Sequence, residues 1–136
     1  MPVDAGDPEE KKSVTLDAAS NSMSGGKAVK FDGSGNITLT TANDDDYVGV
    51  TQKKLSESDN KWTVHVCGMV VPVVVDGTVD AGETLVPSGS TDGEWVAHTN
   101  GMYEANPDTS AGAVAANHPF AIEDGTDGDT IRAVFR

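Results

Sequence analysis

The sequence predicts an all-β protein, folded as a small β-barrel or β-sandwich of short strands. Apolar and polar residues alternate over short runs, and clusters of Gly, Asp and Asn separate these runs. No window shows the helical periodicity of about 3.6 residues together with capping residues. Aromatic residues make up only 5% of the chain, so Val, Ile, Leu, Ala and Met must form most of the core.

Strands are expected wherever an alternating run lies between two turn clusters. In the first half, the turns are the glycine-rich segment 32–36 and the acidic segment 43–46. Trp62 and Val64 share one face of the strand that follows the next loop, and His65 lies on the other face. The strands expected in this half are 13–16, 27–31, 37–41, 47–51 and 62–67.

The second half begins with a long apolar strand at 69–75. Pro72 has no N–H to donate, so this strand must lie at a sheet edge or contain a bulge. The turn at 99–101 predicts a hairpin between strands 94–98 and 102–104. The remaining strands are expected at 84–86, 119–122 and 130–135.

The chain is expected to consist of a flexible N-terminal arm, residues 1–12, and a single β domain, residues 13–136. The arm is polar and contains two prolines and a cluster of charged residues, without an alternating pattern. It lacks the basic and apolar regions of a signal peptide, and the chain has no apolar run of about 18 residues or more. We therefore expect neither export by a signal peptide nor a transmembrane helix.

The net charge of −13 restricts the partners that this protein can bind. Acidic residues number 22 and basic residues 9, and the acids lie mostly between the apolar runs. Nucleic acids and anionic membranes both attract clustered Lys and Arg, so neither is expected as a direct partner. An acidic surface suits concentrated salt, where screening reduces self-repulsion. The sequence thus favours a halophilic protein, with an ordinary acidic protein as the alternative.

Residue types that carry catalysis are present, but no known catalytic motif surrounds them. His65, His98 and His118 are the best catalytic candidates, yet the chain has no Gly-x-Ser-x-Gly, His-Glu-x-x-His or phosphate-binding glycine loop. His65 and Cys67 point the same way on one strand, but two ligands do not make a metal site. Cys67 is the only cysteine, which excludes an internal disulfide. We expect no enzymatic activity and no cofactor.

The acidic segment 123–129 is the best candidate for binding a hard cation. Its residues Asp124, Asp127 and Asp129 are weak candidates, because Ca²⁺ takes about six to eight oxygen ligands and the spacing of a calcium-binding hand is absent. Asp and Gly also favour tight turns for local reasons, and this interpretation is preferred. The same two interpretations apply to the acidic turn 44–46.

The lysines of the first half form a second candidate surface. They bind either an acidic partner or only solvent, and the sequence leaves both interpretations open. These lysines are Lys27, Lys30, Lys53, Lys54 and Lys61.

A series of short segments gives the chain a recognisable order of turns and strands. They are GKAV at 26–29, DG at 32–33, VGV at 48–50, VHVCGMV at 64–70, DAGETL at 80–85, FAIED at 120–124 and GDTIR at 128–132. In this order they resemble the small capsid decoration (cement) proteins of tailed viruses, over most of the chain after residue 25. Glu83 departs from that pattern, in which Asp is commoner, and the loops 53–61 and 88–117 are longer. With the acidic composition, the resemblance suggests a virus that infects halophilic archaea.

The resemblance implies a structural role on the virion. Such proteins sit on the outer surface of the icosahedral shell as homotrimers and bridge neighbouring copies of the major capsid protein. Residues 2–16, represented by Pro2, Val3, Val14 and Leu16, are then expected to form the arm that contacts the capsid or a neighbouring subunit. The alternative function is a cell-surface or surface-layer β domain for adhesion or coat assembly. A small hydrolase or a sugar-binding enzyme is a third class, but the chain offers no set of site residues for it.

Overall fold

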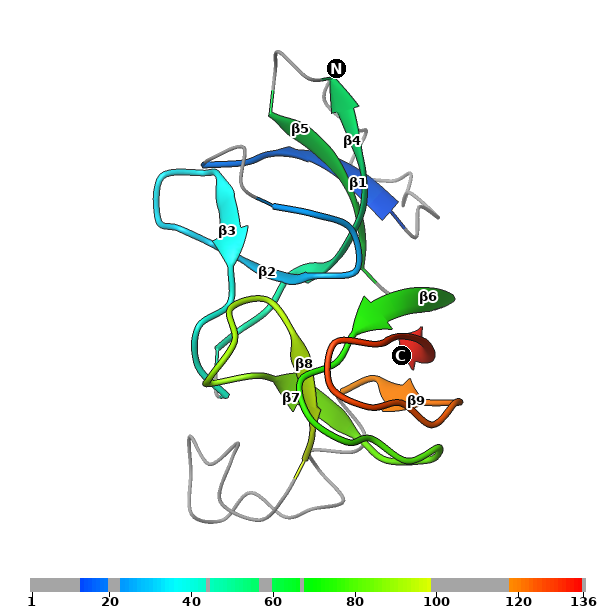
Figure 1. The fold of residues 1–136 in the computed structure, drawn as a ribbon. Coiled ribbons are helices and arrows are strands. Elements are labelled where there is room, and N and C mark those ends of the chain that lie inside the picture. Colours follow the sequence, from blue (N-terminus) through cyan, green and yellow to red (C-terminus); the bar gives the residue numbers. More distant parts are fainter. Residues whose placement is uncertain are drawn as a thin grey trace, which may run out of the picture.

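The computed structural model describes residues 13–19, 23–43, 45–56, 60–66, 68–98 and 118–135, with only the backbone of residues 53–56, and it has no helix in these segments. The predicted all-β class is confirmed (Figure 1). The expected arm at 1–12 and the expected strand at 102–104 lie outside the described residues. The strands are β1 (Ser13–Asp17), β2 (Ala28–Phe31), β3 (Ile37–Leu39), β4 (Gly49–Ser56), β5 (Lys61–His65), β6 (Met69–Val74), β7 (Leu85–Pro87), β8 (Trp95–Ala97), β9 (Phe120–Ala121) and β10 (Thr130–Phe135).

The N-terminal lobe, residues 13–66, is built on one antiparallel sheet in the order β1-β5-β4-β2-β3. Its two edge strands meet at a single parallel bridge between Ala18 and Ile37, where Ala19 N donates to Ile37 O at 2.9 Å. Because one bridge and not a ladder joins them, the sheet curls without closing into a barrel. It surrounds a small N-terminal core of Ala18, Met23, Val29, Ile37, Trp62 and Val64.

Gly49, in the VGV segment, lies where β4 passes very close to β5. A Cβ at this position would overlap the carbonyl oxygen of His65, which belongs to the β5 backbone. The next residue, Val50, pairs with His65 in the β4–β5 ladder. Only glycine therefore allows the two strands to approach here.

The C-terminal lobe, residues 68–135, contains a sheet in the order β6-β10-β9 and the separate pair β7-β8. In Figure 1 it lies below the N-terminal lobe. Two residues of the N-terminal lobe, Ala28 and Val50, belong to its core, so the lobes share buried apolar surface. The other members of this main core are Val71, Val73, Val75, Val79, Leu85, Trp95, Ala121, Ile131, Ala133 and Phe135. The described residues contain no helix that could span a membrane.

Two details of the C-terminal lobe bear on the sequence expectations. Pro72 lies in β6, an edge strand of its sheet, as its missing N–H requires. β8 pairs with β7, with Leu85 opposite Ala97 and Pro87 opposite Trp95. The hairpin expected from β8 to 102–104 involves a segment outside the described residues, and β7 is a partner that local turn signals did not suggest.

The backbone of Gly26 connects the two lobes. Its carbonyl oxygen accepts from Val74 N in β6 at 3.0 Å, and its N donates to Thr51 O in β4 at 2.7 Å. Because Val74 N points toward Gly26, the alternating pattern of the strand places the nitrogen of Pro72 on this same open side of β6. The edge of the C-terminal sheet is therefore covered by a loop of the N-terminal lobe.

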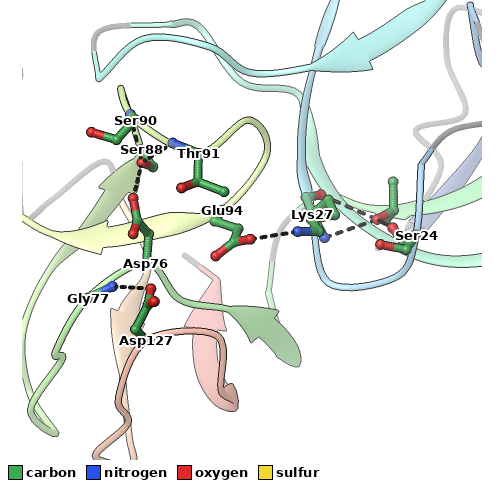
Figure 2. Close-up of polar contacts among 10 residues, drawn as sticks. Ser24, Lys27, Asp76, Gly77, Ser88, Ser90, Thr91, Glu94 and Asp127 are labelled. Atoms are coloured by element: carbon green, nitrogen blue, oxygen red, sulfur yellow. Dashed lines mark hydrogen bonds and ion pairs between the residues drawn. The ribbon is translucent and has the colours of Figure 1, made fainter.

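Gly93 makes the matching connection from the C-terminal lobe. Its N donates to Thr40 O at 2.9 Å, and its O accepts from Ala28 N at 2.7 Å. Beside it, the Lys27 ammonium lies 3.0 Å from a Glu94 carboxylate oxygen, and both side chains are largely buried (Figure 2). The interlobe junction, residues 24–28 with 93–94, is thus held by backbone hydrogen bonds and one partly buried ion pair.

We expect Gly26→Ala to destabilise the protein more than Gly77→Ala. Both glycines have a φ of +78°, so alanine adopts a left-handed backbone at either position, at a cost of about 1–2 kcal/mol. At Gly26 the new Cβ would also lie 3.1 Å from Val74 Cγ2, whereas nothing lies within 4 Å at Gly77. The free energy of unfolding should fall by about 1–3 kcal/mol more for Gly26→Ala, measured by urea denaturation. Equal losses would contradict tight packing at the interlobe junction.

Candidate functional site

The structure separates His65 from the other two histidines, of which His118 lies near His98. His65 ends β5, buried, with its Nδ1 3.1 Å from the Met69 sulfur. His98 follows β8 and is half-buried. His118 is 3% exposed and its Nδ1 lies 3.0 Å from the Tyr47 hydroxyl. Cys67, the expected neighbour of His65 on its strand face, lies outside the described residues.

His118 belongs to an aromatic cluster at the main core, to which the N-terminal lobe contributes Tyr47. The Tyr47 ring packs edge-on against Trp95, with centroids 5.0 Å apart, and against Phe135 at 5.8 Å. Trp95 and Phe135 also meet edge-on at 5.7 Å. Edge-to-face pairs of this kind stabilise by about 0.5–1.5 kcal/mol beyond the burial of their area. The cluster is therefore structural, and it brings together three of the few aromatic residues from distant parts of the chain.

The cation candidates each accept hydrogen bonds within the protein. Asp124 Oδ1 accepts from Ala81 N at 2.8 Å, and Asp127 Oδ1 accepts from Gly77 N at 3.0 Å. Asp129 Oδ2 accepts from both the N–H and the hydroxyl of Thr126. Within the described part of the chain, no group of three or more His, Cys, Asp and Glu side chains is arranged to hold a metal ion. These carboxylates are organised as turn acceptors.

The hydrogen bonds lower the pKa values of two carboxyls in the 123–129 loop. The Arg132 N–H, followed by its guanidinium, lowers the pKa of Glu123. The Thr126 N–H and hydroxyl lower the pKa of Asp129. Both donors bond to the ionised form, so these carboxyls remain charged to lower pH than ordinary ones.

The acidic turn 44–46 is organised in the same way. Burial raises the pKa of Asp45, but hydrogen bonds from Thr41 N–H and the Lys30 ammonium outweigh it, and the pKa is lowered. The Asp45 Oδ2 accepts from Thr41 N at 2.7 Å and from Ala42 N at 3.0 Å. Asp44 lies outside the described residues.

The lysines of the first half are mostly paired within the chain. Lys27 pairs with Glu94, Lys30 with Asp45 at 3.0 Å and Lys61 with Asp17 at 2.9 Å. The side chains of Lys53 and Lys54 are outside the described set. These intramolecular pairs reduce the charge that the lysines present to an acidic partner.

The residues expected in the contact arm separate into two groups. Val14 and Leu16 lie in β1, opposite Val64 and Trp62, and pack half-buried against the N-terminal core. They belong to the folded sheet, so deleting residues 2–16 would remove an edge strand as well as the arm. Pro2 and Val3 lie outside the described residues.

A partly exposed apolar surface lies on the sheet β6-β10-β9. Val70, Val134 and Phe120 are directly opposite one another across its three strands, so their side chains point to the same face. Val70 is 54% exposed, and Val134 and Phe120 are half-buried. The intervening residues, such as Val71 and Ala133, are buried in the main core on the opposite face. We call the surface centred on Val70, Val134 and Phe120 the outer face.

The sequence signal for the outer face is weak because β6 is apolar on both sides. Its run Met69–Val74 contains no polar residue, which is typical of a strand buried on both faces. Pro72 places this strand at an edge, and the combination of an edge strand with a fully apolar run is the one local indication of an exposed apolar surface.

No family model matches the chain, and no curated protein matches it. The fold and the outer face are therefore the observations on which a function can be proposed.

The stability of the protein should fall between pH 6.5 and pH 4 because of His118. Burial, with the nearby His98, lowers the pKa of His118 from 6.5 to about 4. The unfolded chain therefore binds a proton in this range that the folded protein does not, and stability is lost as the pH falls. His118 lowers the free energy of unfolding over this pH range by about 3 kcal/mol at most.

Urea denaturation from pH 7.5 to pH 4.5 measures this dependence. His118→Gln should flatten it, because glutamine does not ionise and keeps a hydrogen-bonding group near Tyr47. His98→Gln is the control that retains His118, and it should keep most of the dependence. The same slope in His118→Gln and the unsubstituted protein would assign it to other groups.

Proposed function

We propose that this protein is a capsid decoration protein, which binds the outside of an icosahedral virus shell and stabilises contacts between major capsid proteins. The observation that carries the proposal is the outer face, a partly exposed apolar surface centred on Val70. Apolar surfaces of this kind commonly mark protein–protein contacts. The order of the GKAV, VGV, DAGETL and GDTIR segments supports the choice of this class.

The fold is compatible with assembly around a threefold axis. β1 is an edge strand of the N-terminal sheet, and an edge strand offers backbone N–H and C=O groups to a neighbouring chain. Three heterologous contacts related by a closed rotation would make a homotrimer in which such edges are covered. On a shell, many weak contacts act together, so each subunit needs only modest affinity.

Labelling of native particles tests this function. Antibodies raised against the purified protein should label the outer surface of particles of the virus that encodes it, as seen by immunogold electron microscopy. Particles produced without the protein are the matched control and should remain unlabelled. Labelling of the cell envelope with unlabelled particles would favour the alternative, a cell-surface or surface-layer domain.

We further expect the protein to require salt. With a net charge of −13, repulsion between carboxylates opposes the compact state, and about 1 M salt reduces the screening length to about 3 Å. The melting temperature should rise by several degrees between 0.1 M and 2 M KCl. Sucrose at equal osmolality is the control for effects other than screening, and it should raise the melting temperature less. Equal stability in dilute buffer and 2 M KCl would contradict a halophilic protein.

A further inference from the structure

The two ends of the outer face differ in their surroundings. The apolar row of Val70, Val134 and Phe120 lies at one end. Val74, opposite Thr130, lies four residues further along β6, which places it roughly 13 Å from Val70. Between these ends, Arg132 pairs with Pro72 in register, and its guanidinium is held by Glu123 at 2.8 Å.

Two acidic turns lie side by side beyond the Val74 end. They are residues 76–83, which follow β6, and residues 123–129, which precede β10. The chain then runs back beside β9, where Thr84 bridges to Phe120, but the Glu83 carboxylate still accepts from Asp80 N in the turn at 2.6 Å. Val79 and Gly125 exchange backbone hydrogen bonds of 2.8 and 2.9 Å between the turns. The Gly77 N–H also donates to Asp127, as Figure 2 shows. We call these paired turns the acidic tip.

The acidic tip carries a negative excess, because the described C-terminal lobe has a single basic residue, Arg132 of β10, which pairs with the Glu123 carboxylate. Its seven acidic residues are accompanied by no Lys or Arg within either turn. Across the described residues, the C-terminal lobe has nine acids and one arginine, whereas the N-terminal lobe has four acids and five lysines. The acidic residues of the tip are Asp76, Asp80, Glu83, Glu123, Asp124, Asp127 and Asp129.

We propose that the outer face and the acidic tip together form the docking surface for a shell protein whose exposed apolar patch has Lys and Arg on one side. The inference rests on the proposed function, which supplies the shell as partner. The apolar row contacts the patch, and the acidic tip, which lies beyond Val74, contacts the basic side. The apolar contact provides affinity in concentrated salt, while the charges select the orientation.

The same charges argue against a second copy of this chain as the occupant. Two outer faces packed together would bring two acidic C-terminal lobes close to each other, and like charges repel. The lysines whose side chains the structure describes in the N-terminal lobe do not offer a strongly basic alternative, because Lys27, Lys30 and Lys61 each pair with a carboxylate of their own chain. A basic surface on another protein matches the acidic tip better.

Rebinding to particles produced without the protein tests the apolar part of this surface. In 2 M KCl, Val70→Asp should weaken rebinding at least tenfold, because the contact would bury a charge. Phe31→Asp is the matched control: Phe31 is also 54% exposed but lies in β2 of the other lobe, so rebinding should change less than twofold. Circular dichroism confirms that both variants are folded.

A second set of variants tests the acidic tip. Asp124→Asn/Asp127→Asn/Asp129→Asn removes three charges while each amide oxygen can still accept the hydrogen bond of its turn. Rebinding in 0.5 M KCl should weaken about tenfold, and less in 2 M KCl, where charges are screened. Asp17→Asn/Asp32→Asn/Asp92→Asn makes the same change in net charge away from the tip and should have little effect.

The outcomes separate this inference from the proposed function. Failure of the unsubstituted protein to rebind would overturn both. Rebinding of the unsubstituted protein with equal rebinding of Val70→Asp would overturn the docking surface alone, as would equal losses in Val70→Asp and Phe31→Asp. Sedimentation of the purified protein tests whether a second copy of the chain binds the outer face instead. Self-association that Val70→Asp abolishes, with particle binding unchanged, would assign the outer face to a second copy.

Discussion

The backbone hydrogen bonding at the interlobe junction is the constraint on which the rest of the structure depends. The described residues contain no helix to cover a sheet, so loops must satisfy the open edges of the strands. Gly26 accepts from Val74 in β6, and Gly93 bonds to both Thr40 and Ala28. These bonds bring Ala28 into the main core, so that two small sheets share one set of buried side chains.

Acidic side chains also connect loops in the C-terminal lobe. Asp124 and Asp127 accept backbone N–H groups from a turn more than forty residues away, and so they join the loops at one end of the C-terminal lobe. Acidic side chains in such turns serve the fold locally while adding to the repulsion within the C-terminal lobe and between molecules. The described part of the N-terminal lobe is nearly balanced in charge, and the C-terminal lobe carries most of the negative excess.

The sequence predicted those features that depend on neighbouring residues. The alternation of apolar and polar residues predicted the positions of most strands, and the missing N–H of Pro72 predicted that β6 lies at a sheet edge. The turn chemistry of Asp and Gly anticipated the loop 123–129, whose aspartates accept hydrogen bonds from nearby or facing backbone. Val14 and Leu16 were expected in a contact arm whose last residues, 13–16, form a predicted strand. In the structure they lie in β1 and pack against the N-terminal core. A local pattern does not reveal whether a half-buried strand faces its own core or a neighbour.

By itself, the sequence determined the all-β class, the strongly acidic surface and the separation of lysines into the first half of the chain. These follow from composition and from periodicity along neighbouring residues, which act before any tertiary contact forms. Tertiary structure alone decided that β7 is the partner of β8, that Tyr47, Trp95 and Phe135 meet, and that Val70, Val134 and Phe120 form one row on the outer face. Each of these joins residues far apart in the chain, and their pairing depends on which strands the shared core brings together.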